Sequence, residues 1–116
     1  MFRFESLDIW KIAIEYGNKL YDIADSLPKK EMYGLSSQLK KAAVSISNNI
    51  AEGSGANTIK DFSCFLDVSI KSALETVNIL YFAKLRNYIT ETNREELYKE
   101  SEVLIKKIRA FKNSLK

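Results

Sequence analysis

Histidine is absent from this 116-residue chain, which also contains only one cysteine, one proline and four glycines. Without histidine there is no Ser-His or Cys-His catalytic pair and no histidine metal site. One cysteine forms neither an internal disulfide nor a thiolate cluster, which is typical of a reduced, cytoplasmic protein. So little proline and glycine is too little turn material for a protein of many β-strands. We therefore expect an all-α protein without a cofactor or a metal.

Long apolar runs are also missing. No run approaches the roughly 20 residues that cross a bilayer, and the charged start of the chain does not resemble a signal peptide. The net charge of +3 is mild, and 46% of the residues are hydrophobic. A chain of this length and composition is expected to fold as one domain, residues 1–116, without a membrane partner.

Apolar residues recur at spacings of three and four, which predicts helices. Short breaks around Pro28, Gly53 and Asn87 separate the helical stretches, and Ser6, Thr58 and Asn93 are candidate N-caps. The predicted helices are four: about Ser6 to Ser26, Met32 to Glu52, Ile59 to Arg86 and Arg94 to Ser114. Four amphipathic helices with short connections favour an antiparallel up-down-up-down four-helix bundle.

The first and third stretches carry more apolar surface than one core contact uses. In the first stretch, two adjacent rows, one with Ile14 and Tyr21 and one with Tyr16, cover roughly 200° of the helix, against about 100° for an ordinary surface helix. The third stretch has apolar residues such as Val68, Ile79 and Phe82 outside its main stripe. This excess predicts self-association in a closed ring or a dimer.

A polar row runs beside the apolar side of the second stretch. Its members are Gln38, Lys41, Ser45, Asn49 and Glu52. One interpretation is a line of contacts to a ligand or RNA. The other is a polar seam between helices, in which Ser45 and Asn49 would hydrogen-bond to Ser69, Ser72 or Thr76.

The end of the fourth stretch is basic. From Val103 onward it contains five cationic residues and no acid: Lys106, Lys107, Arg109, Lys112 and Lys116. These cations could bind phosphates of a nucleic acid, or they could form a solvated face that the helix dipole favours. A ring would repeat the charges around its axis and strengthen their field.

Catalytic chemistry finds little support. Glu52 and Glu75 have no second carboxylate at a matching offset, and the glycines around Ser54 lack the lysine of a phosphate-binding loop. Cys64 stands in an apolar stretch without a base to activate it, which predicts a buried, inert thiol. We therefore expect a protein that is not an enzyme.

The second and third stretches carry a recognisable pattern. Its most specific part is the run Ala42-Ala43-Val44-Ser45-Ile46-Ser47-Asn48-Asn49-Ile50-Ala51-Glu52-Gly53, preceded by Phe4-Glu5-Ser6-Leu7-Asp8-Ile9-Trp10 and followed by Phe62, Phe65-Leu66, Ser72 and Glu75. The chain resembles the bacterial four-helix-bundle family of 23S rRNA intervening-sequence proteins, to which accessory proteins of diversity-generating retroelements are similar.

The resemblance implies a homopentameric ring of four-helix bundles without enzymatic activity. It also implies signature residues of structural role at these positions: Tyr33, Gly34, Gln38, Ser45, Asn49, Glu52, Gly53, Ser72 and Glu75. The expected function is a cytoplasmic scaffold that binds RNA, DNA or a nucleic-acid-processing partner. The alternative is a purely protein-binding oligomeric adaptor with no nucleic-acid role.

Overall fold

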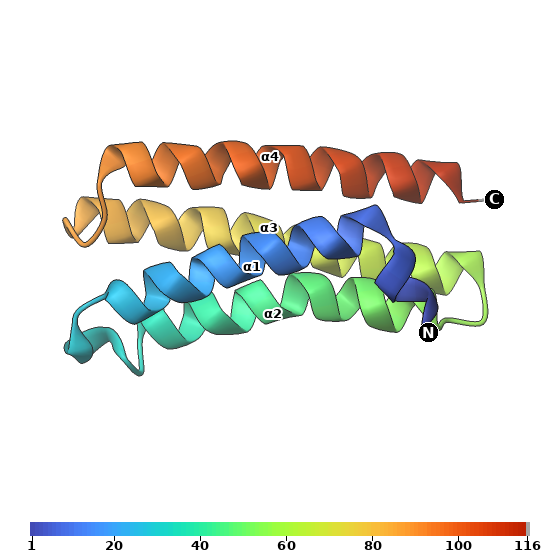
Figure 1. The fold of residues 1–116 in the computed structure, drawn as a ribbon, viewed down its shortest axis with the longest axis horizontal. Coiled ribbons are helices and arrows are strands. Elements are labelled where there is room, and N and C mark those ends of the chain that lie inside the picture. Colours follow the sequence, from blue (N-terminus) through green and yellow to red (C-terminus); the bar gives the residue numbers. More distant parts are fainter. Residues whose placement is uncertain (116) are drawn as a thin grey trace.

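The computed structural model describes residues 1–115, in which four α-helices and two short 3-10 turns are found and no strand (Figure 1). The prediction of an all-α chain with four helices is confirmed. The elements are η1 Arg3–Ser6, α1 Asp8–Ser26, η2 Lys29–Glu31, α2 Leu35–Ser54, α3 Ile59–Leu85 and α4 Glu91–Ser114.

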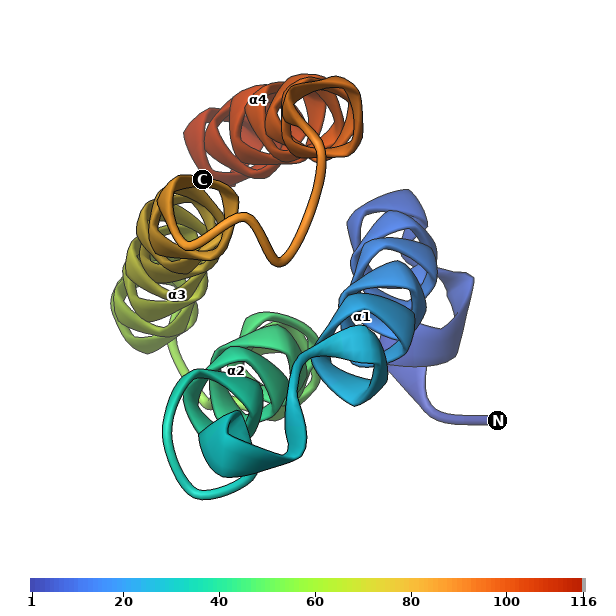
Figure 2. The same cartoon turned by 90° about the vertical axis from the view of Figure 1, so that its left-hand side faces the viewer.

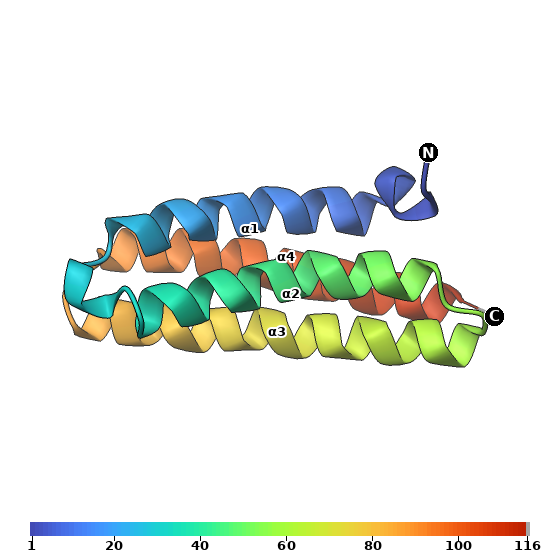
Figure 3. The same ribbon diagram turned by 90° about the horizontal axis from the view of Figure 1, so that it is seen from below.

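The helices lie side by side in a rod of 45 × 24 × 22 Å. Seen along the rod, each helix stands at one corner, with α1 beside α2 and α4, and α3 beside α2 and α4 (Figure 2). The most extensive contact joins α2 and α3, which run alongside each other over most of their length (Figure 3). The α1–α2 pair and the α3–α4 pair therefore form opposite sides of the molecule.

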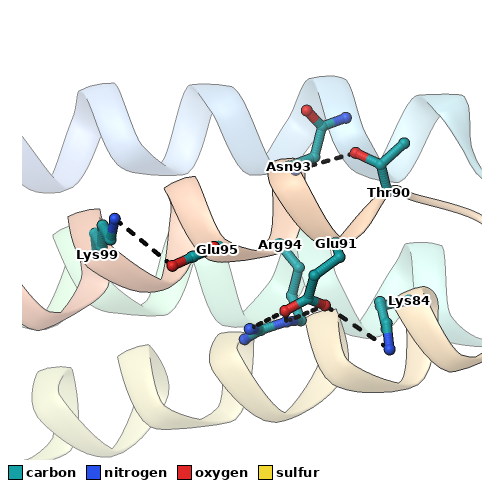
Figure 4. Close-up of polar contacts among 7 residues, drawn as sticks. All are labelled: Lys84, Thr90, Glu91, Asn93, Arg94, Glu95 and Lys99. Atoms are coloured by element: carbon teal, nitrogen blue, oxygen red, sulfur yellow. Dashed lines mark hydrogen bonds and ion pairs between the residues drawn. The ribbon is translucent and has the colours of Figure 1, made fainter.

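Two predicted helix starts are wrong, for local reasons. Ser6 belongs to η1 and donates a hydrogen bond to the Arg3 carbonyl (2.8 Å), so α1 begins at Asp8 without a side-chain cap. Asn93 lies inside the first turn of α4, where its N–H donates to Thr90 Oγ1 (3.0 Å; Figure 4). The cap at Thr58 is confirmed, because its hydroxyl accepts the Asp61 N–H at 3.1 Å. Threonine hydroxyls thus cap the two helices that build one side of the rod.

The core is formed by one apolar side of every helix. Its fully buried side chains include Leu20, Leu39, Ile46, Ile50, Leu66, Leu80, Leu104 and Ile108. Of the two apolar rows on α1, the row with Tyr16 belongs to this core, whereas Ile14 and Tyr21 of the other row stay 43% and 38% exposed. On α3, Ile79 is buried but Val68 and Phe82 face outward. The surplus apolar surface is therefore real but smaller than the rows suggest.

Cys64 corrects a prediction. The expected buried thiol is exposed, because Phe62 and Leu66 supply the core contacts and Cys64 lies on the opposite face of α3. Val68, one turn further along, shares that outward face and is 43% exposed. We define the outer face of α3 by Cys64, Val68 and Phe82.

Candidate nucleic-acid interface

The cations at the end of α4 divide into groups of different surroundings. Lys106, Lys107 and Arg109 are exposed, and Lys112 is half-buried with its Nζ 2.8 Å from Asp67 Oδ1 on α3. Lys116, which the sequence placed in the same basic set, lies outside the described residues. The structure therefore leaves three exposed cations and one that is engaged with α3.

A groove between α3 and α4 brings most of these cations together. It consists of two cavities of about 600 and 450 Å³ that share Leu74 and Arg109. We call it the α3–α4 groove, and its lining is Asp67, Ile70, Lys71, Leu74, Tyr98, Lys99, Glu102, Val103, Ile105, Lys106, Arg109, Lys112 and Asn113. Lys107 lines neither cavity, so the basic sequence run is not one continuous surface.

The lining of the groove is positively charged. It contains five cations, Lys71, Lys99, Lys106, Arg109 and Lys112, against the two carboxylates of Asp67 and Glu102. Lys112 pairs with Asp67, and Lys99 lies 3.6 Å from Glu95 outside the groove. Within residues 1–115, Lys71, Lys106 and Arg109 have no ion-pair partner. These three free cations give the groove its attraction for anions.

Arg94 holds the first turn of α4 in place beside the groove (Figure 4). The residue is only 9% exposed. Its Nε donates to both carboxylate oxygens of Glu91, at 2.9 and 3.1 Å, and its guanidinium stacks on the rings of Tyr81 and Tyr98. This hydrogen bond lowers the pKa of Glu91 and raises the pKa of Arg94. Since Tyr98 also lines the groove, the Arg94 contacts position α4 against α3 where the groove begins.

The polar row of α2 faces α3 at its centre. Ser45 Oγ lies 2.7 Å from Ser72 Oγ across the two helices. Asn49 Nδ2 donates within α2, to the Ser45 carbonyl (2.7 Å) and hydroxyl (3.1 Å). A second bond joins the helices, from Ser69 Oγ to the Ile46 carbonyl (2.8 Å). The predicted bond from Ser45 to α3 is confirmed, whereas the one predicted from Asn49 is wrong, because the Asn49 amide donates to Ser45 within its own helix.

Glycine allows a close approach of two helices at one signature position. A Cβ at Gly53 would lie 2.8 Å from atoms of both Phe62 and Phe65, so α2 and α3 meet there at a distance only glycine allows. At Gly34 a Cβ would meet only the end of the flexible Glu31 side chain, which can move aside. The remaining signature residues Tyr33, Gln38, Glu52 and Glu75 are exposed.

Two contributors to the groove escaped the sequence analysis. Lys71 and Leu74 of α3 line it, and Leu74 is 51% exposed. Their spacing of three residues would place them on one helical face, but no sequence pattern indicates that α4 lies beside that face. For residues 1–115, no group of three or more His, Cys, Asp and Glu side chains could hold a metal ion. Nor is any helix in this part of the chain long and apolar enough to span a membrane.

Together these features define an all-α four-helix protein with a basic groove on one side. A model of the family described as 23S rRNA-intervening sequence protein matches residues 5–110, and the chain belongs to this family. A crystal structure from Bacteroides thetaiotaomicron VPI-5482, described as a protein of unknown function from the S23 ribosomal protein family, has the same fold. Its TM-score is 0.84 at 22% identity, over 91% of this chain and 99% of that chain. No curated protein matches the chain.

Proposed function

We propose that the chain is the subunit of a non-enzymatic, cytoplasmic ring of up-down-up-down bundles that binds RNA or DNA along the α3–α4 groove. The observation that carries the nucleic-acid role is the excess of free cations in that groove, Lys71, Lys106 and Arg109. Phosphate contacts of this kind supply most of the sequence-independent affinity for nucleic acids. The absence of histidine supports the non-enzymatic part of the proposal.

The length of the groove suits an extended backbone. At 1.5 Å per residue, the helical segment from Lys99 to Lys112 spans about 20 Å. Leu74 and Val103, each 51% exposed, supply apolar surface between the cations. Because a ring repeats the groove in every subunit, several weak sites would act on one nucleic acid at high local concentration.

Two different exposed apolar faces support the proposal of a ring. One is the outer face of α3, with Val68 and Phe82, and the other surrounds Ile14 on α1. A head-to-tail contact that closes into a ring needs two such different surfaces. The family resemblance supports five subunits. Native mass spectrometry at micromolar concentration is expected to give a closed homo-oligomer, and a monomer would contradict the ring.

The nucleic-acid role is tested by titrating a single-stranded RNA of about 20 nucleotides over a salt series. Lys106→Gln should weaken binding and flatten the plot of log K against log salt by about 0.7 for each phosphate that the protein no longer neutralises. Lys107→Gln is the matched control, because this neighbouring cation lines neither cavity of the groove.

Equal effects of the two variants would show that overall charge, and not the groove, binds the RNA. A wild-type protein that binds no RNA or DNA at low salt would contradict the nucleic-acid role altogether. It would favour the protein-binding adaptor, whose contact would then involve the exposed Leu74 and Val103.

A further inference from the structure

A cavity of about 850 Å³ lies on the other side of the molecule, where α1 ends and α2 begins. It is bounded by the last turn of α1, by η2 and by the first turns of α2, and its lining contains Lys29, Tyr33, Ser36, Ser37 and Lys41. None of these residues belongs to the α3–α4 groove. We call it the α1–α2 cavity.

The first turn of α2 has hydrogen-bond donors without acceptors. Gly34 occupies the N-cap position and has no side chain to cap the helix. The Leu35 N–H donates to Glu31 Oε1 at 3.3 Å, while residues 1–115 offer no acceptor to the N–H groups of Ser36 and Ser37. The free amides and the dipole of a 20-residue helix favour an anion at this point.

Ser36 gives a second and independent indication of a ligand. Its side chain is only 8% exposed and lines the cavity, yet its hydroxyl forms no hydrogen bond within the described part of the chain. Other helical serines, such as Ser26 and Ser54, donate to a carbonyl three residues earlier. The Ser36 hydroxyl is therefore free to bond to a ligand in the cavity.

The charge of the cavity has the sign that an anion requires. Lys29 and Lys41 have no ion-pair partner within residues 1–115. Lys40 pairs with Asp25 at 2.6 Å, and its ammonium also lies 5.2 Å from the centre of the Tyr21 ring. Three lysines against one carboxylate leave the lining with two net positive charges, and the Glu31 carboxylate at the Leu35 amide reduces the local excess to one.

An exposed aromatic ring adjoins these donors. Tyr33 is 93% exposed and lines the cavity, so its ring faces are free to stack on a flat ligand. Tyrosine faces stack on nucleobases of any sequence. Tyr21 is less available because Lys40 lies over its ring.

We propose that the α1–α2 cavity binds a nucleoside phosphate, with the phosphate at Ser36 and Ser37, Lys41 beside it and the base on Tyr33. Glu31 already holds the Leu35 amide, which leaves the phosphate the two following amides. The site goes beyond the α3–α4 groove and does not depend on it. A nucleoside phosphate has two sources, a free nucleotide and the phosphorylated end of a nucleic acid.

Calorimetric titration of the full chain with AMP, adenosine and inorganic phosphate tests the site. AMP should bind at least about tenfold more tightly than either part alone, because it uses both the phosphate and the stacking contacts. Ser36→Asp, which places a carboxylate where the phosphate would lie, should abolish AMP binding. Tyr33→Leu should reduce AMP affinity to that of phosphate.

Lys29→Gln and Lys30→Gln form a matched pair, because only Lys29 lines the cavity. Lys29→Gln should weaken AMP binding and Lys30→Gln should not. Circular dichroism and native mass spectrometry confirm that each variant is folded and assembled as the wild type is. Equal affinities for AMP and adenosine, or an unchanged affinity in folded Ser36→Asp, would overturn the proposal.

A 5′-phosphorylated pentanucleotide distinguishes the two sources. Binding tighter than that of AMP, abolished in Ser36→Asp, assigns the site to a nucleic-acid end, and equal binding assigns it to the free nucleotide. Lys106→Gln should leave AMP affinity unchanged. RNA binding that responds to Lys106→Gln while AMP does not bind at all would overturn this site and leave the proposed function intact.

Discussion

The α3–α4 groove belongs to one helix pair of the rod and the α1–α2 cavity to the other, and both are positively charged. Figure 2 shows that these two helix pairs form opposite sides of the molecule. The groove is built from the sides of two long helices, with aliphatic Leu74 and Val103 between its cations. The cavity is built around a helix start, with serine donors and the exposed ring of Tyr33. The two surfaces have the same sign of charge but different shapes. The groove suits the phosphates of an extended backbone, and the cavity suits a single phosphate with its base.

The strongest way to separate the two sides is to loosen α4 alone. Leu104→Ala removes a fully buried side chain of α4 and should lower the free energy of unfolding by about 3 kcal/mol. In the fraction that remains folded, RNA binding should weaken while AMP binding stays unchanged. Urea denaturation followed by circular dichroism measures the first effect. A decrease below about 1 kcal/mol would mean that α4 contributes little to the core.

Charge reversal sharpens the same comparison without touching the core. Lys106→Glu combined with Arg109→Glu should weaken RNA binding by about 100-fold, because two attractive phosphate contacts become repulsive. Lys29→Glu with Lys41→Glu should leave RNA binding by the groove nearly unchanged and abolish AMP binding. Filter binding and calorimetry on the two double variants give the answer. If each double variant weakens the binding of RNA and of AMP to the same extent, the two sides are not separate sites.

A smaller loss of stability is expected when a hydrogen bond that joins the two sides through the core is removed. The Tyr16 hydroxyl on α1 lies 2.9 Å from Thr76 Oγ1 on α3, and burial raises the pKa of Tyr16. Tyr16→Phe should cost about 1 kcal/mol of unfolding free energy, as for one buried hydrogen bond. Binding at both sides should persist. Chemical denaturation measures the change, and a stabilised variant would show that the hydroxyl is not well satisfied.

The smallest effect is a difference in pH response. The hydrogen bond from Arg94 places the pKa of Glu91 below its ordinary value of 4.5. The stability that this pair contributes is therefore present above pH 4.5 and is lost as the pH falls through the pKa of Glu91 in the folded protein. The hydrogen bond with Asp25 raises the pKa of Lys40 above 10.5. The stability that the Lys40–Asp25 pair contributes is therefore lost as the pH rises above 10.5 and through the pKa of Lys40 in the folded protein. Acid should therefore loosen the α3–α4 side, and alkali the α1–α2 side.

Melting temperatures of the wild type and of Glu91→Gln, recorded at intervals between about pH 3 and 7, test the acid side. The wild type should lose its advantage over the variant as the solution is acidified, because protonated Glu91 no longer pairs with Arg94. A constant difference would remove Glu91 from the acid response. Melting temperatures of the wild type and of Lys40→Met test the alkaline side. The difference between them should shrink as the pH rises above 10.5.

Much of the fold follows from sequence periodicity, because apolar spacing of three and four reports the buried side of each helix. The N-cap preference of serine and asparagine placed Ser6 and Asn93 wrongly as caps, since Leu7 and Thr90 occupy those positions and competing local hydrogen bonds decide a helix start. Cys64 was misplaced because apolar neighbours along the chain do not fix which face a residue takes.

The candidate sites were less accessible to sequence analysis. The α4 cations were found as a run, but Lys107 lies outside the groove and Lys71 joins from α3, which depends on the packing of two helices. For the α1–α2 cavity the sequence offered only the polar row, of which Lys41 and Ser45 line it; the cavity itself arises where a turn brings Lys29 and Tyr33 beside the start of α2.

The exposure of Cys64 provides a direct test of the proposed ring. Its thiol is the only one in the chain and lies on the outer face of α3, beside Val68. A thiol on a free subunit is open to alkylation by a maleimide, whereas a neighbouring subunit seated on this face would shield it. The rate of this single modification should therefore fall as protein concentration rises if subunits associate through this face.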